Sequence, residues 1–479
     1  MNAVLQLKRS KADQPKIGLI HFGPGAFFRG FNAVFTSEVM QAEGGDWGVC
    51  AVSLRSSDIR DKLVTQDYAY TSVTLDPQKA EHQVIEVIQN ILVAPESPKA
   101  VLDVMISPDV KIVSMTITEK GYCHNPANGD LCDDDADILH DLEHEDNPRT
   151  AIGFLVHALN QRRIKGLLPF TVLSCDNLPN NGALTKNIVL AFANKVDREL
   201  ADWIHREAKF PSTMVDRITP ATTDKDVDAL LDIAGYYDVG CVVHEHFRQW
   251  VIEDDFVDNC RPNWNLSGAQ FVKDVEPFEL MKLRCLNGTH SALAYLGYLA
   301  GYETVFEAVS DEDFAGFIDR LWTEEIIPTL PQLDGIDLAV YCADLKKRYQ
   351  NSEIRHLTWQ IAMDGSQKIP QRILGTIRDN LRSGASISGL ALVIAAWLRY
   401  VGAVDEQGND IDVKDPLAVE LKTTSQSHEL PEDKVKALLA LRAVFDEDLA
   451  NDNRFCSVVT NAYISLTEMG SKNTVKAHL

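Results

Sequence analysis

Ile17-Gly-Leu-Ile-His-Phe22 runs directly into Gly23-Pro-Gly25-Ala-Phe-Phe28-Arg29-Gly30, and this stretch decides the fold of the N-terminal half. The first six residues form an apolar run of strand length, and the glycines after them permit a tight turn. In a Rossmann domain, a strand that passes through Gly-x-Gly into a helix holds the pyrophosphate of a dinucleotide. The motif is imperfect because Phe28 stands at the third glycine position. A simple tight turn is the alternative, but the place of the motif after a first strand favours a dinucleotide site.

The rest of the N-terminal half alternates strand-like runs with helical patterns, which is typical of a mostly parallel sheet covered by helices. Further strands are expected at 48–54, 110–118 and 170–174, with edge strands at 241–246 and 249–252. Helices are expected at 33–41, 57–64, 151–162, 183–198 and 226–235. Beyond residue 277 long helical patterns dominate, at 279–299, 311–325, 387–401 and 432–445. We therefore predict an α/β Rossmann-type dinucleotide-binding domain over residues 1–276 and a mainly α-helical substrate-binding and catalytic domain over residues 277–479.

Composition excludes two classes of partner. A net charge of −24 over 479 residues argues against nucleic acid and against an anionic membrane surface, since both attract clustered Lys and Arg. No window is apolar enough to span a membrane, and the first ten residues lack a signal-peptide core. The nine cysteines are scattered, with no Cys-x-x-Cys pair, which fits reduced thiols and gives no zinc knuckle. We expect a soluble, cytoplasmic protein.

The second informative stretch is Glu276-Pro-Phe-Glu279-Leu-Met-Lys282-Leu-Arg-Cys-Leu-Asn287-Gly-Thr-His290. At about 100° per residue of an α-helix, Lys282, Asn287 and His290 fall within an arc of roughly 140°. Glu279 falls inside the same arc. A solvated helix face is the alternative interpretation, but the surrounding residues are mostly apolar, which predicts a buried helix. Such a polar wall suits a polyhydroxylated ligand, and a buried lysine can act as acid or base near neutral pH.

The end of the second expected strand bears on the choice of cofactor. An acidic residue at this place normally holds the ribose of NAD, and here only Asp58 qualifies, later than usual. Arg55 could instead face the 2′-phosphate of NADP. The residues alone leave NAD and NADP open.

Five motifs occur in order along the chain. They are Gly-x-Gly at 23–25, Thr118-Glu119-Lys-Gly-Tyr122, Ser174-Cys-Asp-Asn177, Val215-Asp216-Arg217 and Lys282-x4-Asn287-x2-His290. Together they resemble the polyol-specific long-chain dehydrogenase (mannitol dehydrogenase) family over nearly the whole chain. Within that family, the segments 247–254, 359–368 and 404–409 look most like members that interconvert D-mannonate and D-fructuronate. The resemblance implies that reaction, with NAD, without a metal, and in a monomer.

The resemblance also implies roles for individual residues. Lys282 would be the general acid and base, and Glu279 would relay protons between it and water. Asn177 and Asn287 would clamp the reacting oxygen, as neutral donors should where negative charge develops. The implied substrate-binding residues are His290, Asp216, Lys368, Gln360 and Arg372. The implied cofactor-binding residues are Gly23, Gly25, Phe28, Arg29, Asp58, Thr118 and Glu119.

Two positions depart from the family pattern. The family usually has His where Phe28 stands, so an imidazole there is not essential. Members that act on mannitol generally have arginine where this chain has Gln360, which puts mannitol itself in doubt, while Lys368 is retained. The carboxylate of a sugar acid still needs a cation, and Arg355, Lys368 and Arg372 are the candidates nearby.

Four features have a competing interpretation. Asn177 could be a turn residue before Pro179, and Asp216 with Arg217 could be a structural ion pair. His244 and His246 share a strand face, but the spacing and the lack of a third ligand favour a structural role over zinc. Cys285 could be a nucleophile, although a small buried residue is the better interpretation.

Two other functions remain open from the sequence. The chain could be a mannitol- or arabinitol-type polyol 2-dehydrogenase, which substrate comparison would separate. It could also be a catalytically silent nucleotide-binding sensor, against which the retained Lys282 argues, since a sensor needs no proton-transfer group.

Overall fold

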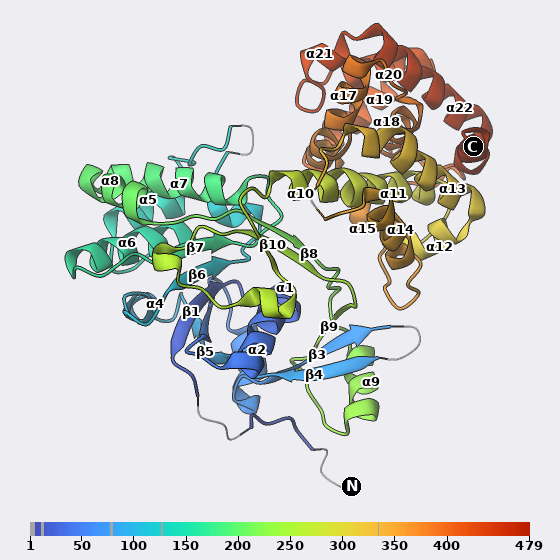
Figure 1. Cartoon of the computed structure of the whole chain (residues 1–479). Helices are drawn as coiled ribbons and strands as arrows, with labels where there is room; N and C mark the ends of the chain where they lie inside the picture. Colours follow the sequence, from blue (N-terminus) through green and yellow to red (C-terminus); the bar gives the residue numbers. More distant parts are fainter. Residues whose placement is uncertain (1–4, 11–13, 77–79, 126–127, 334) are drawn as a thin grey trace. The chain divides into compact units, whose positions relative to one another are not determined.

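The computed structural model describes residues 5–10, 14–76, 80–125, 128–333 and 335–479. Residues 1–4, part of the stretch judged to lack a signal-peptide core, lie outside the described residues. The chain divides into two compact units, Met1–Glu276 and Pro277–Leu479 (Figure 1). The first unit is α/β and the second is helical, which confirms the predicted fold class. None of the helices within the described residues combines the length and apolar character needed to cross a membrane.

A five-stranded parallel sheet forms the centre of the first unit. Its order is β5-β2-β1-β6-β7, and every neighbouring pair runs in parallel. The strands are β1 (Ile17–Phe22), β2 (Gly48–Ser53), β5 (Ile88–Val93), β6 (Ile112–Met115) and β7 (Thr171–Ser174). The chain leaves β1 for β2 on one side and reaches β6 on the other, so the strand order reverses between β1 and β6. Ligands of such sheets bind beyond the carboxyl ends of the strands at this reversal.

Alternating side chains of the sheet enter two different cores. Ile20, Phe22 and Val113 face a core shared with helices on one side of the sheet. These helices are α4 (Pro98–Met105), α5 (Ala136–Glu143), α6 (Ala151–Ile164), α7 (Asn181–Val196) and α8 (Arg198–Glu207). Leu19 and Ala51 face the opposite core, with α1 (Ala26–Gly30), α2 (Asn32–Glu43) and α3 (Asp58–Leu63). Figure 1 shows α4, α6 and α7 gathered on one side of the sheet and α2 on the other.

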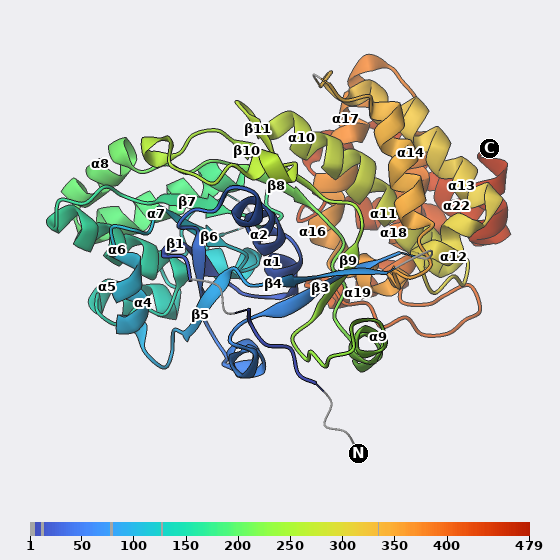
Figure 2. The same ribbon diagram turned by 60° about the horizontal axis from the view of Figure 1, so that its bottom comes forward.

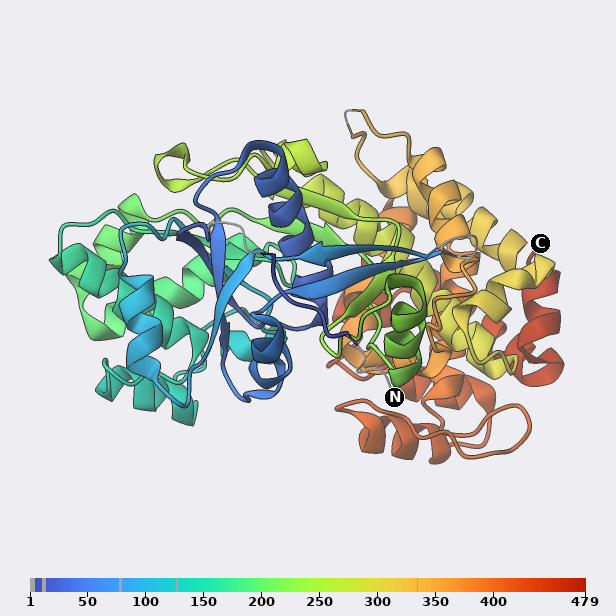
Figure 3. The ribbon, with the colours of Figure 1, turned by 90° about the horizontal axis from the view of Figure 1, so that it is seen from below.

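Two three-stranded sheets complete the first unit. One has the order β4-β3-β9 and the other β11-β10-β8. Their strands are β3 (Tyr70–Leu75), β4 (Glu81–Ile85), β8 (Thr213–Asp216), β9 (Val242–Glu245), β10 (Gln249–Glu253) and β11 (Gln270–Val272). Helix α9 (Asp224–Ala234) packs beside the β3–β4 hairpin through a small apolar cluster that includes Val73 and Leu230 (Figure 3). The runs expected at 241–246 and 249–252 are strands, but they belong to these smaller sheets.

The second unit is built around two apolar helices, α11 (Thr289–Leu299) and α18 (Ser388–Tyr400). Nearly all residues of both are buried, and the view in Figure 2 places them among the other helices of the unit. Around them lie α10 (Glu276–Met281), α12 (Val305–Ser310), α13 (Glu312–Arg320), α14 (Leu338–Tyr349), α15 (Thr358–Ala362), α16 (Gly365–Ile369), α17 (Gly375–Ser383), α19 (Ala418–Gln426), α20 (Pro431–Leu439), α21 (Glu447–Ala450) and α22 (Asn453–Ala477). Ser471 of α22 donates a hydrogen bond of 2.7 Å to the Leu296 carbonyl, which ties the last helix to α11.

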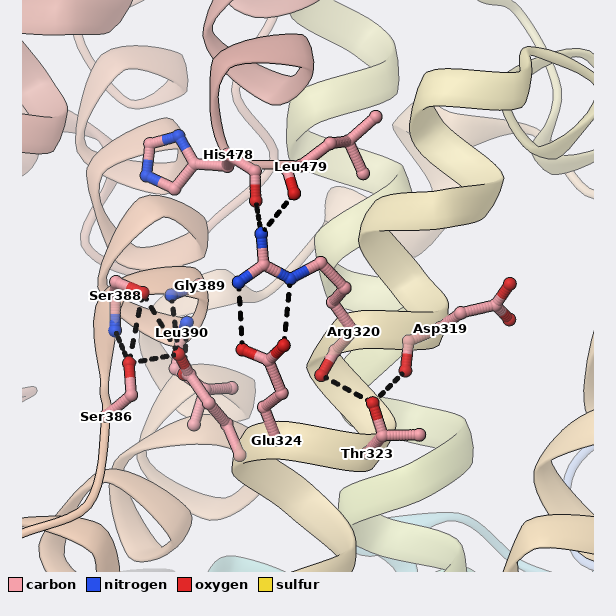
Figure 4. Close-up of polar contacts among 11 residues, drawn as sticks. Asp319, Arg320, Thr323, Glu324, Ser386, Ser388, Gly389, Leu390, His478 and Leu479 are labelled. Atoms are coloured by element: carbon pink, nitrogen blue, oxygen red, sulfur yellow. Dashed lines mark hydrogen bonds and ion pairs between the residues drawn. The ribbon is translucent and has the colours of Figure 1, made fainter.

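A buried carboxylate holds the N-terminus of α18. Glu325 accepts hydrogen bonds from the amides of Gly389 (2.8 Å) and Leu390 (2.9 Å) and from the hydroxyl of Ser386 (3.0 Å). The first amides of a helix have no partner inside it, and a carboxylate there also complements the helix dipole. Figure 4 shows this cluster beside Arg320, which bonds to the carbonyls of the last two residues. These contacts fix the apolar helix against which the rest of the unit packs.

Candidate active site

The Gly-x-Gly loop lies at the carboxyl end of β1, next to the reversal of the strand order. Gly23 has a φ of +90°, and a side chain on it would collide with the carbonyl of Thr116. Only glycine tolerates both conditions. At Gly25 the space is open, because a Cβ there would meet nothing nearer than the Gly23 carbonyl at 4.0 Å. The loop therefore offers an uncovered backbone of the kind that a pyrophosphate approaches.

The aromatic ring at the third motif position packs inward. Phe28 stacks on His21, with ring centroids 3.6 Å apart and planes 11° apart. His21 bonds to the hydroxyls of Ser114 (2.8 Å) and Thr116 (2.9 Å), so it joins β1 to β6. Burial lowers the pKa of His21 to about 3, which keeps its ring neutral. Phe28 thus supports the Gly-x-Gly loop by packing on His21 of β1. Its predicted contact with the cofactor stays a prediction.

Arg29 is also turned into the protein. Its guanidinium donates to the carbonyls of Pro24 (3.3 Å) and Gly240, and the Tyr70 hydroxyl donates to its own carbonyl at 2.7 Å. Burial lowers the pKa of Arg29. These contacts brace the loop from the β9 side, and any effect of Arg29 on the cofactor is expected to act through the shape of the loop.

The loop after β6 flanks the other side of the reversal and carries backbone strain. Thr118 has a φ of +65° and a ψ of 163°, which a residue with a side chain rarely adopts. Asp176, in the loop after β7, accepts the amides of Ile117 and Thr118, both at 2.9 Å, and the Tyr122 hydroxyl at 2.8 Å. Burial raises the pKa of Asp176, and these hydrogen bonds oppose the rise. One carboxylate therefore ties together two of the sequence motifs, and sequence reasoning missed it. Its place beside Asn177 was the available signal.

Asp176 also explains where β6 ends. The sequence predicted a strand over 110–118, but β6 covers only Ile112–Met115. The amides of Ile117 and Thr118 bond to Asp176 instead of to a neighbouring strand, so the run leaves the sheet early. Glu119 then starts a short 3-10 helix, Glu119–Tyr122. Thr118 and Glu119 thus stand at the predicted cofactor edge of the sheet, and their contact with the cofactor remains a prediction.

The loop after β2 carries the residues that bear on the nucleotide. Arg55 and Asp58 are both exposed, and Asp58 is the first residue of α3. The Ser56 hydroxyl donates to the Asp58 carboxylate at 3.0 Å. This loop follows the strand next to β1, which is where the adenosine ribose lies in a Rossmann domain.

Asn177 and Asp216 are the predicted substrate-side residues of the first unit. Asn177 is exposed in the loop after β7, whereas Asp216 is buried at the end of β8. Arg217 donates to the carbonyls of Gly30 (2.7 Å) and Glu245 (3.1 Å), which gives this arginine a structural role. Burial lowers the pKa of Arg217 to about 9. The hydrogen bonds of the Arg217 guanidinium are thus made with backbone carbonyls. The predicted role of Asp216 in binding substrate stays a prediction.

In the second unit, Lys282 and Asn287 lie on a π-helical turn, η5 (Lys282–Gly288), between α10 and α11. Both side chains are 8% exposed. The sequence predicted one α-helix over 279–299, so the arc worked out at 100° per residue was wrong for this segment. In a π turn the hydrogen bonds run from i to i+5, so residues five apart stack. The spacing of five thus aligns Lys282 with Asn287 more closely than an α-helix would.

Side chains around the turn explain why it widens. The carbonyl of Cys285 accepts hydrogen bonds from Thr289 Oγ1 (2.5 Å) and from Trp322 Nε1 (3.0 Å). The carbonyl of Leu286 accepts one from the Tyr349 hydroxyl (3.1 Å). Side chains that take over backbone acceptors loosen the regular helical ladder. Two further π turns, η6 (Leu321–Ile326) and η8 (Pro370–Leu374), pack against η5.

His290 is the second residue of α11 and lies about one helical turn beyond Asn287. It is 7% exposed, and its ring lies 4.8 Å from that of Tyr349 and 5.0 Å from that of His356. Burial lowers the pKa of His290 well below its usual value, and the neighbouring His356, Arg372, Arg348 and Lys282 lower it further. His290 is therefore neutral and buried among cations.

The other predicted substrate residues of the second unit differ in their placement. Lys368 and Arg372 are half-buried on α16 and η8, and both influence the pKa of His356. Gln360 is exposed on α15. Glu279 lies three residues before Lys282, on α10. The structure thus brings Lys282, Asn287, His290, Lys368 and Arg372 together within one unit.

The competing interpretations of two motifs can be compared with the structure. His244 is buried and bonds to Ser72 Oγ (2.6 Å) and the Glu245 carbonyl (2.9 Å), whereas His246 is exposed. No group of three His, Cys, Asp or Glu side chains among the described residues suits a metal ion. Cys285 is buried, and its hydrogen bond with Cys342 raises its pKa well above the usual value, which makes it a poor nucleophile.

Comparison with known proteins places this geometry in a family. The sequence profile of the mannitol dehydrogenase Rossmann domain matches residues 17–266, and that of the mannitol dehydrogenase C-terminal domain matches residues 274–467. The chain belongs to the mannitol dehydrogenase family. This finding confirms the resemblance and makes the protein an oxidoreductase of that family.

Individual relatives in the mannitol dehydrogenase family span almost the whole chain. D-mannonate oxidoreductase of Escherichia coli (strain K12) is 45% identical over 464 residues, which is 96% of this chain and 95% of that protein. Mannitol 2-dehydrogenase of Pyricularia oryzae is 40% identical over 468 residues, covering 96% and 92% of the two chains. The structure of Pseudomonas fluorescens mannitol 2-dehydrogenase in a ternary complex with NAD and D-mannitol matches with a TM-score of 0.87 and 39% identity, over 99% and 97% of the chains.

Proposed function

We propose that this chain interconverts D-mannonate and D-fructuronate with NAD as cofactor. The oxidoreductase chemistry is supported chiefly by one observation, the buried Lys282 aligned with Asn287 on the π turn η5. The choice of a sugar acid is supported by the 45% identity to a D-mannonate oxidoreductase and by Gln360 in place of the arginine of mannitol-type members.

The first unit fits its cofactor. NAD is the cofactor of this chain, and the uncovered backbone at Gly23 and Gly25 suits its pyrophosphate. When bound, NADH supplies the hydride that reduces a ketone, and NAD⁺ accepts it in the reverse direction. The residues Thr118 and Glu119, beyond the end of β6, would border the same edge of the sheet.

The chain's own residues supply the proton and hold the substrate. In reduction, the Lys282 ammonium gives a proton to the ketone oxygen, so that ketone, hydride and proton yield the alcohol. In oxidation, neutral Lys282 takes the proton back, and Glu279 exchanges it with water. Amide donors, Asn287 here and Asn177 by resemblance, stabilise the oxygen while negative charge builds on it. His290 and Asp216 would bind the remaining hydroxyls.

The proposal is tested with purified protein by following NADH absorbance. We expect D-fructuronate to be reduced, and D-mannonate to be oxidised with a higher kcat/KM than D-mannitol. The second candidate is a mannitol- or arabinitol-type polyol 2-dehydrogenase, favoured by the 40% identity to a mannitol 2-dehydrogenase. Oxidation of D-mannitol with an efficiency equal to or above that of D-mannonate would establish this candidate instead. A silent sensor would show no turnover with either.

We predict a preference for NADH over NADPH. Asp58 lies at the start of α3, where a carboxylate would repel the 2′-phosphate of NADPH. We expect kcat/KM to favour NADH by roughly tenfold or more, about 1.4 kcal/mol of discrimination. The measurement compares initial rates with the two cofactors at one substrate concentration. A higher value with NADPH would reverse the prediction and point to Arg55 as the residue facing the phosphate.

We predict that catalysis does not depend on a bound metal. Lys282 provides the proton that a metal-bound water or Lewis acid handles in other dehydrogenases. Prolonged chelation followed by metal analysis and assay should leave kcat unchanged. If activity is lost and zinc restores it, Lys282 is not the proton donor.

Two properties of the protein in the cell complete the proposal. All nine cysteines are free, which fits a reducing compartment such as the cytoplasm.

We further propose that the enzyme acts as a monomer. Light scattering coupled to size-exclusion chromatography would test this, and a stable dimer would contradict it.

A further inference from the structure

Four cationic or imidazole side chains gather beside the π turn η5. They come from separate segments: His290 lies on α11, His356 precedes α15, Lys368 lies on α16 and Arg372 on η8. Arg372 Nη1 donates to the hydroxyl of Ser291 at 3.3 Å. The backbone of η8 packs closely on η5, since a Cβ on Gly288 would come within 3.3 Å of the Arg372 carbonyl. The cluster is therefore part of the same surface as Lys282 and Asn287.

The members of this cluster act on one another electrostatically. Burial lowers the pKa of His356 to about 4, and the charges of Arg372 and Lys368 contribute to the fall. Burial also lowers the pKa of Lys368 to about 8; Arg372 adds to this, while Asp364 and Asp415 oppose it. For Arg372 burial lowers the pKa, and the opposing groups are the hydroxyls of Tyr295 and Tyr349 rather than carboxylates. The cluster carries positive charge in a poorly hydrated place.

No carboxylate among the described residues lies within ion-pair distance of Lys368 or Arg372. Two other arginines of the unit do have such a partner. Arg284 lies 2.8 Å from Asp379, and Arg355 lies 2.7 Å from Glu303. The Arg355 side chain is also 70% exposed, so solvent screens its charge, which is already paired with Glu303. A half-buried cation without a carboxylate partner carries a desolvation cost that a bound anion would offset.

Two buried ring nitrogens lie beside these cations. His290 Nε2 and His356 Nδ1 are buried and have no hydrogen-bond partner among the described residues. The two rings meet edge to face, 5.0 Å apart and at 85°. Buried polar atoms without a partner are rare in native proteins. A ligand that offers oxygen atoms would satisfy both nitrogens and the guanidinium together.

We propose that Arg372 and His356 form a carboxylate-binding subsite that selects sugar acids over uncharged polyols. The planar guanidinium can hold a carboxylate through two parallel hydrogen bonds, and the neutral imidazole can add a third donor. Lys368 contributes a further positive charge, which also lowers the pKa of His356. The inference rests on the proposed function, because it names the group of the substrate that the active site recognises.

The subsite lies at a suitable place along the helix. Ser291, which contacts Arg372, follows Lys282 by nine residues, which is less than about 13 Å along the axis, because the π turn η5 rises less per residue than the 1.5 Å of an α-helix. The lysine side chain and the carbon chain of a hexose derivative can together cover such a separation. The reacting carbon would then lie at Lys282 and Asn287, and the acid group at the far end of the substrate.

The test compares Arg372→Gln with the matched control Arg355→Gln. Each variant is assayed with D-fructuronate and with its uncharged analogue D-fructose, and the Kd for NADH is measured as a check on folding. For Arg372→Gln we expect kcat/KM for D-fructuronate to fall roughly 30- to 3,000-fold, chiefly through KM. Activity on D-fructose and NADH binding should stay unchanged, and Arg355→Gln should behave like the parent enzyme. Arg372→Lys keeps the positive charge but cannot make two parallel hydrogen bonds to a carboxylate. Its kcat/KM for D-fructuronate should therefore lie between those of Arg372→Gln and the parent enzyme.

Other outcomes separate the subsite from the proposed function. If Arg372→Gln keeps its efficiency with D-fructuronate, or loses both substrates equally, the subsite is refuted while the proposed function stands. If the parent enzyme reduces neither substrate, the proposed function fails. The subsite is then tested by calorimetric binding of D-mannonate and D-mannitol to the NADH complex, where only the acid should depend on Arg372. Should Arg372→Gln fail to fold, His356→Gln serves in its place, with an expected rise in KM for the acid of roughly tenfold.

Discussion

Replacing Lys282 with methionine is expected to lower kcat by about 10²–10⁴-fold while the Kd for NADH changes little. Methionine keeps most of the volume of the buried side chain, so the π turn should survive the change. What it removes is the amine that we propose as the proton donor and acceptor. Rapid-mixing measurements of NADH oxidation would place the loss in the chemical step rather than in substrate binding.

A surface lysine provides the control for this prediction. Lys476 on α22 is 72% exposed, so Lys476→Met should retain the parent kcat. Small amines are expected to restore part of the activity of Lys282→Ala, because the vacated space admits a small base. A Lys282→Met enzyme that is folded, binds NADH and keeps a near-normal kcat would overturn the mechanism. Glu279→Gln should cost less, since water can replace a proton relay more easily than the primary donor.

Four of the five strands of the central sheet could be predicted from the sequence because the sheet is buried on both faces, whereas β5 was not expected. Strands such as β1 and β2 then appear as continuous apolar runs, which composition alone reveals. The β3–β4 hairpin was missed because Thr71 and Ser72 are buried in β3 despite being polar. Thr71 bonds through its amide to Asp238, and Ser72 bonds to His244. Partners this distant in sequence leave no local pattern.

Helix boundaries failed where a single side chain intervenes. The run expected at 183–198 divides at Asp197, whose carboxylate caps α8 by accepting the amide of Glu199 at 3.0 Å. The helix expected over 432–445 ends with α20 at Leu439. Capping depends on the direction in which the chain turns, and tertiary packing sets that direction.

The burial of the candidate site residues could be predicted, whereas the geometry of their helix could not. The motif identified Lys282, Asn287 and His290, and these residues are buried as the apolar flanks required. The π turn was beyond prediction because it depends on Trp322 and Tyr349, which lie far along the chain and bond to carbonyls of η5. Asp176 escaped notice for the same reason. Asp176 accepts hydrogen bonds from two backbone amides that lie 59 and 58 residues earlier in the chain.

Asn287→Ala is expected to lower kcat by about 10²–10³-fold, or ~2.7–4 kcal/mol of transition-state stabilisation. The amide lies five residues after Lys282 on a turn whose hydrogen bonds also span five residues, so the two side chains project together. In the ground state a ketone oxygen needs little from a second donor. As the hydride arrives, the oxygen gains negative charge, and a neutral donor in a water-poor place then contributes most. The loss should therefore appear in kcat rather than in KM, and Asn177→Ala should behave alike.

Two further variants distinguish this role from a structural one. Asn287→Asp has the same shape but replaces the N–H donor with a negative charge, so it should be slower than Asn287→Ala. Asn473→Ala, at an exposed position on α22, is the matched control and should retain parent kinetics. If Asn287→Asp keeps a normal kcat while Asn287→Ala loses it together with thermal stability, the amide only fills space in the π turn. Lys282 would then have to stabilise the developing charge alone.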